Sequence, residues 1–191
     1  MAATRRVGAV TSKKRDVLLD CVERLMLREG YAGVTYRAVA AKAGVTPGLV
    51  QYYFPTLDEV FLAAIRRRSD QNLERLRTAL EARPDEPLRV LWEYSRDEST
   101  SALTTEFLAL GNHRKSIAAE IAQVSESVRA VQSEAIARVV PKRGMTLEGL
   151  SADALLFLVT GVPKLLRLEE GVGLTATHDE VVRYFERALM P

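Results

Sequence analysis

The chain has 191 residues, of which 47% are hydrophobic and 27% charged, so one large domain, or a small domain fused to a larger one, can bury a sizeable core. No run of about 18 apolar residues occurs, and no signal-peptide stretch follows the basic start, which predicts a cytoplasmic protein without a membrane span. The single cysteine, Cys21, excludes an internal disulfide framework. With only two histidines, His113 and His178, far apart in the sequence, neither a metal site nor a cofactor is predicted.

The net charge of +2 is unevenly distributed along the chain. Residues 1–54 contain nine Lys/Arg and four acids, a net charge of +5, which leaves −3 for residues 55–191. A basic N-terminal part on a mildly acidic body is expected where one end of a protein meets phosphates, but an unevenly charged surface looks the same. Charge alone therefore does not distinguish a phosphate-binding N-terminal part from an unevenly charged surface.

Helical periodicity runs through nearly every segment, and hairpin signals are missing, so we predict an all-α protein of about nine helices. The first is expected at about 13–28, with Ser12 as N-cap and Cys21 inside its apolar stripe. Thr35 is expected to cap a second helix that Gly44 ends. Thr46 is expected to cap a third, which opens at Pro47 and covers about 47–53.

Longer helices are expected in the remainder of the chain. Thr56 and Glu59 form a capping box that opens the fourth helix, which ends near Pro84. The fifth helix is predicted to begin at Pro87. The sixth to ninth helices are predicted to cover about 97–110, 114–140, 147–170 and 178–189. Pro163, inside the eighth of these helices, is expected to kink it or to mark a local irregularity.

The most informative stretch runs from Gly30 to Phe61. Two short capped helices joined by a tight glycine turn follow an amphipathic supporting helix, which is the arrangement of a helix-turn-helix module. The stretch resembles the N-terminal domain of the TetR family of bacterial repressors. The matching elements are Gly30-Tyr31, Thr35-x-Arg37, Val39-Ala40, Ala43-Gly44-Val45-Thr46, Gly48, Tyr52-Tyr53-Phe54 and Leu57-Asp58-Glu59-Val60-Phe61.

The resemblance implies a DNA-binding domain at residues 1–54 and a ligand-binding and dimerisation domain at 55–191. Side chains of the second and third helices would contact DNA. Either Lys13, Lys14 and Arg15 of the first helix or a loose arm with Arg5 and Arg6 would clamp the flanking backbone or minor groove. The DNA-binding residues so implied are Lys13, Lys14, Thr35, Arg37, Thr46, Pro47, Gly48, Gln51, Tyr52 and Tyr53.

Two positions depart from the family pattern. Gln51 stands where the family commonly has tyrosine; glutamine can pair with adenine N6 and N7, or it can bind a phosphate. Leu57 replaces a lysine that often grips phosphate at the start of the fourth helix. Backbone N–H groups of that helix start are the alternative donors.

The body is expected to form a pocket and a dimer interface. The eighth helix is apolar all round at 154–159, so it must be covered on several sides, and the helices at about 147–170 and 178–189 are predicted to pair with a second chain rather than only with a monomeric core. Candidate ligand-binding residues, whose alternative role is plain core or surface, are Phe61, Trp92, Leu103, Phe107, Asn112, His113 and Phe157.

These inferences predict a dimeric, sequence-specific transcriptional regulator, most simply a repressor released from a palindromic operator by a small hydrophobic or amphipathic effector. One alternative is a DNA-binding regulator without a small-molecule ligand, controlled by a protein partner. An enzyme is the distant alternative, because no nucleophile with its base, paired carboxylates or metal-ligand set is legible.

Overall fold

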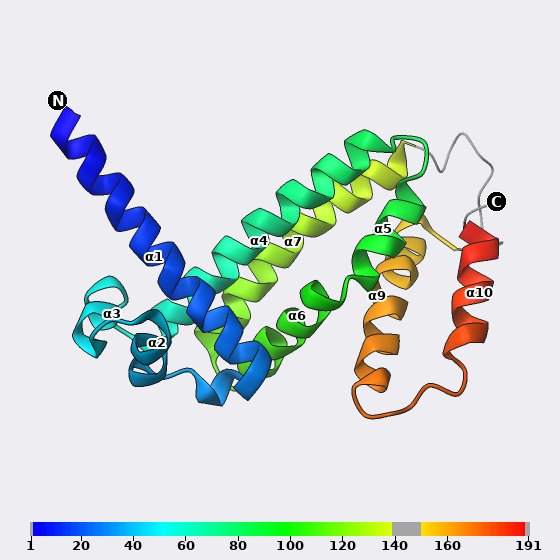
Figure 1. Ribbon diagram of the computed structural model, residues 1–191. Coiled ribbons are helices and arrows are strands. Elements are labelled where there is room, and N and C mark those ends of the chain that lie inside the picture. Colours follow the sequence, from blue (N-terminus) through cyan, green and yellow to red (C-terminus); the bar gives the residue numbers. More distant parts are fainter. Residues whose placement is uncertain (1, 139–149, 190–191) are drawn as a thin grey trace. The chain divides into compact units, whose positions relative to one another are not determined.

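The computed structural model describes the backbone of residues 2–138 and 150–189, and the side chains of these residues except at 2–12, 98–101 and 189. All regular elements of the described chain are helical, as predicted (Figure 1). The α-helices are α1 (Ala2–Glu29), α2 (Tyr36–Ala43), α3 (Pro47–Tyr53), α4 (Leu57–Ala82), α5 (Pro87–Arg96), α6 (Glu98–Gly111), α7 (Lys115–Ala137), α9 (Ala152–Glu170) and α10 (His178–Leu189).

The predicted start of the first helix is wrong. This helix begins at Ala2 rather than after Ser12, so Ser12 lies inside the helix, and Arg5 and Arg6 lie in a helix, not in a loose arm. The long α1 arises because residues 2–12 contain no proline and only one glycine, which leaves no local reason to stop. A 3₁₀ turn, η1 (Tyr31–Gly33), was not expected.

The helix predicted at 147–170 begins later than expected. Ser151 caps α9, because its Oγ accepts a hydrogen bond from Ala154 N at 3.2 Å, and residues 147–149 lie outside the described chain. The helix predicted at about 114–140 is α7, and residue 140 lies outside the described chain as well. Pro163 interrupts no element, since α9 runs through it to Glu170.

The chain divides into two compact units, which are described separately. Unit 1 comprises Met1–Arg68 and Leu103–Ala122, and unit 2 comprises Ser69–Ala102 and Gln123–Pro191. The division cuts α4 and α7 within the helices. The functional boundary expected at residue 54 therefore stays a prediction.

Unit 1 has a core that joins the short helices to α1, α4 and α6. In this core α2 packs against α1 and α3 packs against α2. The fully buried side chains of this unit are Leu18, Leu19, Val22, Met26, Val39, Ala40, Val50, Phe54, Val60, Phe61, Ala64, Leu103, Leu110 and Ile117. Cys21 is buried among them, as predicted.

Unit 2 is organised around Trp92 of α5. Its indole stacks on Phe185 of α10, with ring centroids 4.9 Å apart. Val181 and Val182 of α10 pack against the same cluster, so the apolar stripe of α10 faces the core of its own chain. The other buried members of the cluster are Leu76, Leu88, Leu91, Ile136, Leu155, Leu156 and Val159.

Candidate nucleic-acid interface

The turn between α2 and α3 has the geometry that the sequence predicts. Thr35 Oγ1 accepts a hydrogen bond from Ala38 N at 3.1 Å and so caps α2. Gly44 ends α2 in the left-handed conformation (φ 67°, ψ 35°), which a residue with a Cβ rarely adopts. Val45 N then donates to Ala40 O at 3.0 Å, which closes the turn. Local chemistry alone therefore sets how α3 follows α2.

The start of α3 differs from the prediction in one detail. Thr46 is the N-cap residue and Pro47 occupies the first turn, but no side-chain capping hydrogen bond from Thr46 is present in the described structure. Thr46 is exposed, and its side chain makes no capping hydrogen bond. It is thus available to an external partner.

One face of the helix-turn-helix module is exposed and polar. The side chain of Tyr52 is 77% exposed, although a large aromatic residue is ordinarily buried at least in part. Its ring contacts Tyr53 edge-on, with centroids 5.5 Å apart, and Tyr53 is half-buried. A Cβ added at Gly48 would meet no described atom within 4 Å, so no described atom of the fold requires a glycine there. The exposed residues of this face are Thr35, Arg37, Thr46, Pro47, Gly48, Gln51 and Tyr52.

The opposite face of the module is anchored in the core. Val50 and Phe54 are buried at the end of α3, and Tyr36 Oη donates a hydrogen bond to Phe54 O at 2.9 Å. Burial, followed by the charge of Glu59, raises the pKa of Tyr36 above its usual range, so the phenol stays protonated and keeps donating. Tyr36 and Phe54 therefore have structural roles.

Basic side chains flank the exposed face. Lys13 and Lys14 of α1 are exposed. Arg15 lies over the ring of Phe54, with 5.0 Å between guanidinium carbon and ring centroid, which holds its charge at the base of α3. The side chains of Arg5 and Arg6 lie outside the described part of the chain.

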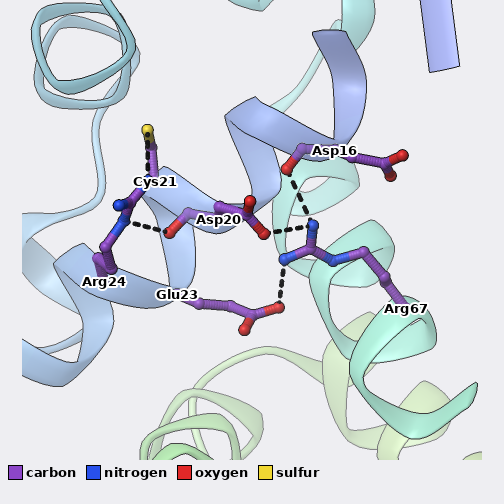
Figure 2. A network of polar contacts seen from close by, with 6 residues as sticks. All are labelled: Asp16, Asp20, Cys21, Glu23, Arg24 and Arg67. Carbon is purple, nitrogen blue, oxygen red and sulfur yellow. Dashed lines mark hydrogen bonds and ion pairs between the residues drawn. The ribbon is translucent and has the colours of Figure 1, made fainter. Parts of the chain in front are cut away.

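Arg67 of α4 joins α4 to α1, and no pattern in the sequence indicates this contact. Its guanidinium reaches Asp20 Oδ1 at 2.8 Å, Glu23 Oε1 at 2.6 Å and Asp16 O at 2.9 Å (Figure 2). The Arg67 side chain is 14% exposed, so the ion pairs are partly desolvated. The partners are 44 to 51 residues away in the chain, beyond what helical periodicity can pair.

The predicted ligand-binding residues fall into three groups. Phe61, Leu103 and Phe107 are buried in unit 1, and Trp92 is buried in unit 2. Asn112 and His113 are exposed at the end of α6, where the His113 ring lies 6.3 Å from that of Tyr31. Phe157 of α9 is 64% exposed. The ligand-binding role of all seven residues stays a prediction.

Trp92, one of the predicted ligand-binding residues, lines a groove of about 610 Å³ in unit 2. It lies between α5 and Glu186 of α10, and Trp92 lines it together with charged residues. The indole Nε1 of Trp92 is buried and has no hydrogen-bond partner among the described residues, and leaving such a donor unpaired costs about 1–3 kcal/mol. Its remaining lining residues are Arg89, Glu93, Arg96 and Asp97.

The described residues hold neither a metal-ligand cluster nor a membrane-spanning helix. No cluster of three or more His, Cys, Asp or Glu side chains there could hold a metal ion. None of the described helices combines the length and the apolar character needed to span a bilayer.

The geometry defines a class of protein: an all-helical chain with a helix-turn-helix module whose predicted recognition residues are exposed. Residues 18–64 match the family model described as "Bacterial regulatory proteins, tetR family". The match covers the helix-turn-helix part of the chain, from within α1 to within α4, and this part is similar to that family. The family and the fold neighbours are transcriptional regulators, not enzymes.

Solved structures share the fold along nearly the whole chain. A putative transcriptional regulator from Saccharomonospora viridis, in complex with choline, is 19% identical with a TM-score of 0.77, over 92% of this chain and 96% of that one. A TetR transcription regulator from Haloarcula marismortui is 17% identical with a TM-score of 0.73, over 93% and 97%. A TetR-family member from Streptomyces coelicolor is 26% identical with a TM-score of 0.60, over 93% and 98%. No curated protein matches the chain.

Proposed function

We propose that the protein is a repressor that binds a palindromic operator as a homodimer and leaves it when a small hydrophobic or amphipathic effector binds. The observation that carries the DNA-binding part of the proposal is the exposure of Arg37 in α2 and of Gln51 and Tyr52 in α3, since none of the three side chains is buried in the core. The arginine of α2 and the amide and phenol of α3 are suited to phosphates and base edges of the major groove.

The dimer is proposed from an uncovered apolar face of α9. Phe157, Leu165 and Leu168 are 64%, 56% and 55% exposed, and their spacing of eight and three residues places them on one side of the helix. Tyr184 of α10 is a further exposed aromatic, at 54%. Because α10 directs its valines to its own core, we assign most of the interface to α9. Two protomers would then present two α3 helices to successive major grooves, about 34 Å apart.

The effector is proposed from the ligand of one similar structure and from one buried donor of this chain. The relative from Saccharomonospora viridis was crystallised in complex with choline. In this chain the unpaired Trp92 Nε1 offers a hydrogen-bond donor beside a large indole surface. A ligand with an apolar body and one acceptor group suits that combination.

Selection of bound fragments from a random DNA pool tests the DNA-binding proposal. The wild-type protein should enrich an inverted repeat, and Arg37→Ala and Tyr52→Ala should each abolish that enrichment while their thermal unfolding stays near that of the wild type. If no sequence is enriched, or if both variants still select the same repeat, the proposed interface is wrong.

Titration of the selected operator with candidate small molecules tests the release. A compound that lowers operator affinity for wild type but not for Trp92→Phe supports the effector site, because phenylalanine keeps an aromatic ring and loses the N–H. Release by a protein from the source cell, with no response to any small molecule, favours the alternative of a partner-controlled regulator.

A further inference from the structure

One side of α9 carries exposed apolar residues between two charges of opposite sign. Phe157 and Leu168 are 64% and 55% exposed, and Gly161 lies between them. Asp153 is exposed four residues before Phe157, and Lys164 is exposed four residues before Leu168. With 3.6 residues per turn, these five residues fall within about 80° of the helix circumference. We call them the α9 stripe.

Neither charge of the α9 stripe is neutralised within its own chain. The described structure contains no ion pair of Asp153 or of Lys164. Partial burial of the amine, followed by the positive charge of Arg129, lowers the pKa of Lys164 below its usual range. A surface that covered the apolar residues would desolvate both charges further, and an unpaired charge in an interface is unfavourable. A fitting partner therefore offers a cation at one end of the stripe and an anion at the other.

A second copy of α9 offers these charges when the two helices run antiparallel. Asp153 and Lys164 are eleven residues apart, which is about three turns, and they differ by only about 20° around the helix axis. A two-fold axis through the middle of this interval places each Asp153 opposite Lys164 of the partner subunit. A parallel pair would instead place like charges opposite each other. The order of charges along the stripe is thus complementary to itself in one orientation only.

The uncharged residues of the α9 stripe fit the same arrangement. Phe157 and Gly161 lie within one turn of the proposed two-fold axis, on opposite sides of it, so the ring of Phe157 would lie beside Gly161 of the partner subunit. Beyond the adjacent backbone, a Cβ at Gly161 would meet only Phe157 Cε1 among the described atoms, at 3.9 Å. The glycine therefore leaves room in the stripe for a large side chain of a second helix.

We infer that Asp153 and Lys164 make the α9 stripe selective for a second copy of this chain: each Asp153 pairs with Lys164 of the partner subunit, and the two ion pairs set the antiparallel register of α9. The inference rests on the proposed homodimer and goes beyond it by naming the residues that choose the partner. A chain of the same fold without this order of charges would leave both charges unpaired in the interface and would be rejected.

Charge reversal combined with mixing tests the pairing. Asp153→Lys and Lys164→Asp each place like charges opposite each other, so each should raise the dissociation constant of its homodimer by about tenfold or more. When the two single variants are mixed, both pairs again join opposite charges, and a heterodimer should form about as tightly as the wild-type homodimer. Sedimentation equilibrium measures the homodimers, and native mass spectrometry with a short tag on one chain measures the mixture.

The double variant, Asp153→Lys with Lys164→Asp, tests partner selection. It restores both ion pairs within its own homodimer but reverses the order of charges relative to the wild type. It should therefore form a homodimer and exclude wild-type chains from it. The control is Glu74→Lys, at an exposed residue of α4 in unit 2, which changes the charge by as much as Asp153→Lys does. This variant should exchange freely with the wild type.

Gly161→Leu tests the packing of the stripe without changing a charge. An added apolar side chain on an exposed surface ordinarily leaves self-association unchanged or promotes it. If Phe157 of the partner subunit occupies the space at Gly161, the leucine should instead raise the dissociation constant of the dimer by about tenfold or more. A dimer of unchanged or greater affinity would overturn the proposed register.

The mixing experiments distinguish failure of the homodimer from failure of the pairing. A monomeric wild type refutes the proposed homodimer. A dimeric wild type whose single variants dimerise equally well, or form no heterodimer when mixed, overturns the pairing and leaves the homodimer standing. Asp153 also lies in the first turn of α9, where an acid favours the helix, but loss of that effect cannot produce recovery on mixing. Free exchange between the double variant and the wild type would overturn the selectivity.

Discussion

Gly44 and Gly48 stand four residues apart in the helix-turn-helix module, and the structure gives them different roles. Gly44 has φ 67°, with nothing within 4 Å of the place where a Cβ would stand. The cost of a side chain there is thus purely conformational. We predict that Gly44→Ala lowers the free energy of unfolding by about 1 kcal/mol, measured by urea denaturation.

Gly48 is in α3, and its φ lies outside the left-handed region. Gly48→Ala should raise the free energy of unfolding by about 0.5 kcal/mol, because alanine is the better helix former. It should weaken operator binding at the same time, because the added methyl group lies on the exposed face. Unfolding and operator titration check the two halves. A variant that is stabilised and binds DNA unchanged would contradict the close approach of this backbone to DNA.

At the scale of single elements, the ion pairs of α4 set a pH dependence. Arg66, chiefly through its hydrogen bonds and against the effect of burial, lowers the pKa of Glu120 below its usual range. A carboxylate whose pKa is lower in the folded state stabilises the protein above its unfolded pKa, and that stabilisation is lost as the pH falls through the folded pKa.

Glu120→Gln should therefore be less stable than the wild type near neutral pH by less than about 1 kcal/mol, because Arg66 is 61% exposed. The difference should shrink as the pH is lowered from about 6 to about 3. Denaturation across this range checks it. A difference that stays constant with pH would show that Glu120 acts by packing rather than by charge.

The elements that the sequence predicted best are those whose ends are set by local chemistry. The bounds of α2 and α3 follow from Thr35, Gly44 and the Thr46-Pro47 pair, each of which acts on its immediate neighbours. The start of α1 could not be predicted in this way, because Ser12 has the side chain of a cap but lies inside a longer helix. A residue with a capping side chain allows a helix to begin after it, but the residues before it determine whether the helix begins there.

The candidate site was predictable only where one helix presents it. Gln51 and Tyr52 could be placed on an exposed face because spacing along α3 determines it. The contacts of Arg67 and the ion pair between Asp58 and Arg114 could not be predicted. Asp58 and Arg114 are 56 residues apart in the chain and meet only because the start of α4 lies beside the start of α7. Long-range ion pairs depend on how helices pack, which periodicity does not specify.

At the scale of the whole molecule, the proposed dimer predicts a change of assembly. Phe157→Asp combined with Leu165→Asp places two charges on the exposed face of α9 and should convert the dimer into a monomer, measured by sedimentation equilibrium. Operator affinity should fall as well, because each protomer then binds a half-site alone. Leu27→Asp, at a residue of α1 that is 47% exposed, is the control and should leave the assembly unchanged. A wild type that is already monomeric, or a double variant that stays dimeric, would contradict the assignment of the interface to α9.

The most direct test of DNA binding by α3 is to determine which residues of the protein contact DNA. A photo-crosslinking amino acid placed at position 52 should react with bases of the selected operator at two symmetric positions, one in each half-site, while the same group at position 27 should not react. Crosslinks from position 27 with none from position 52 would contradict the claim that the exposed face of α3 binds the major groove.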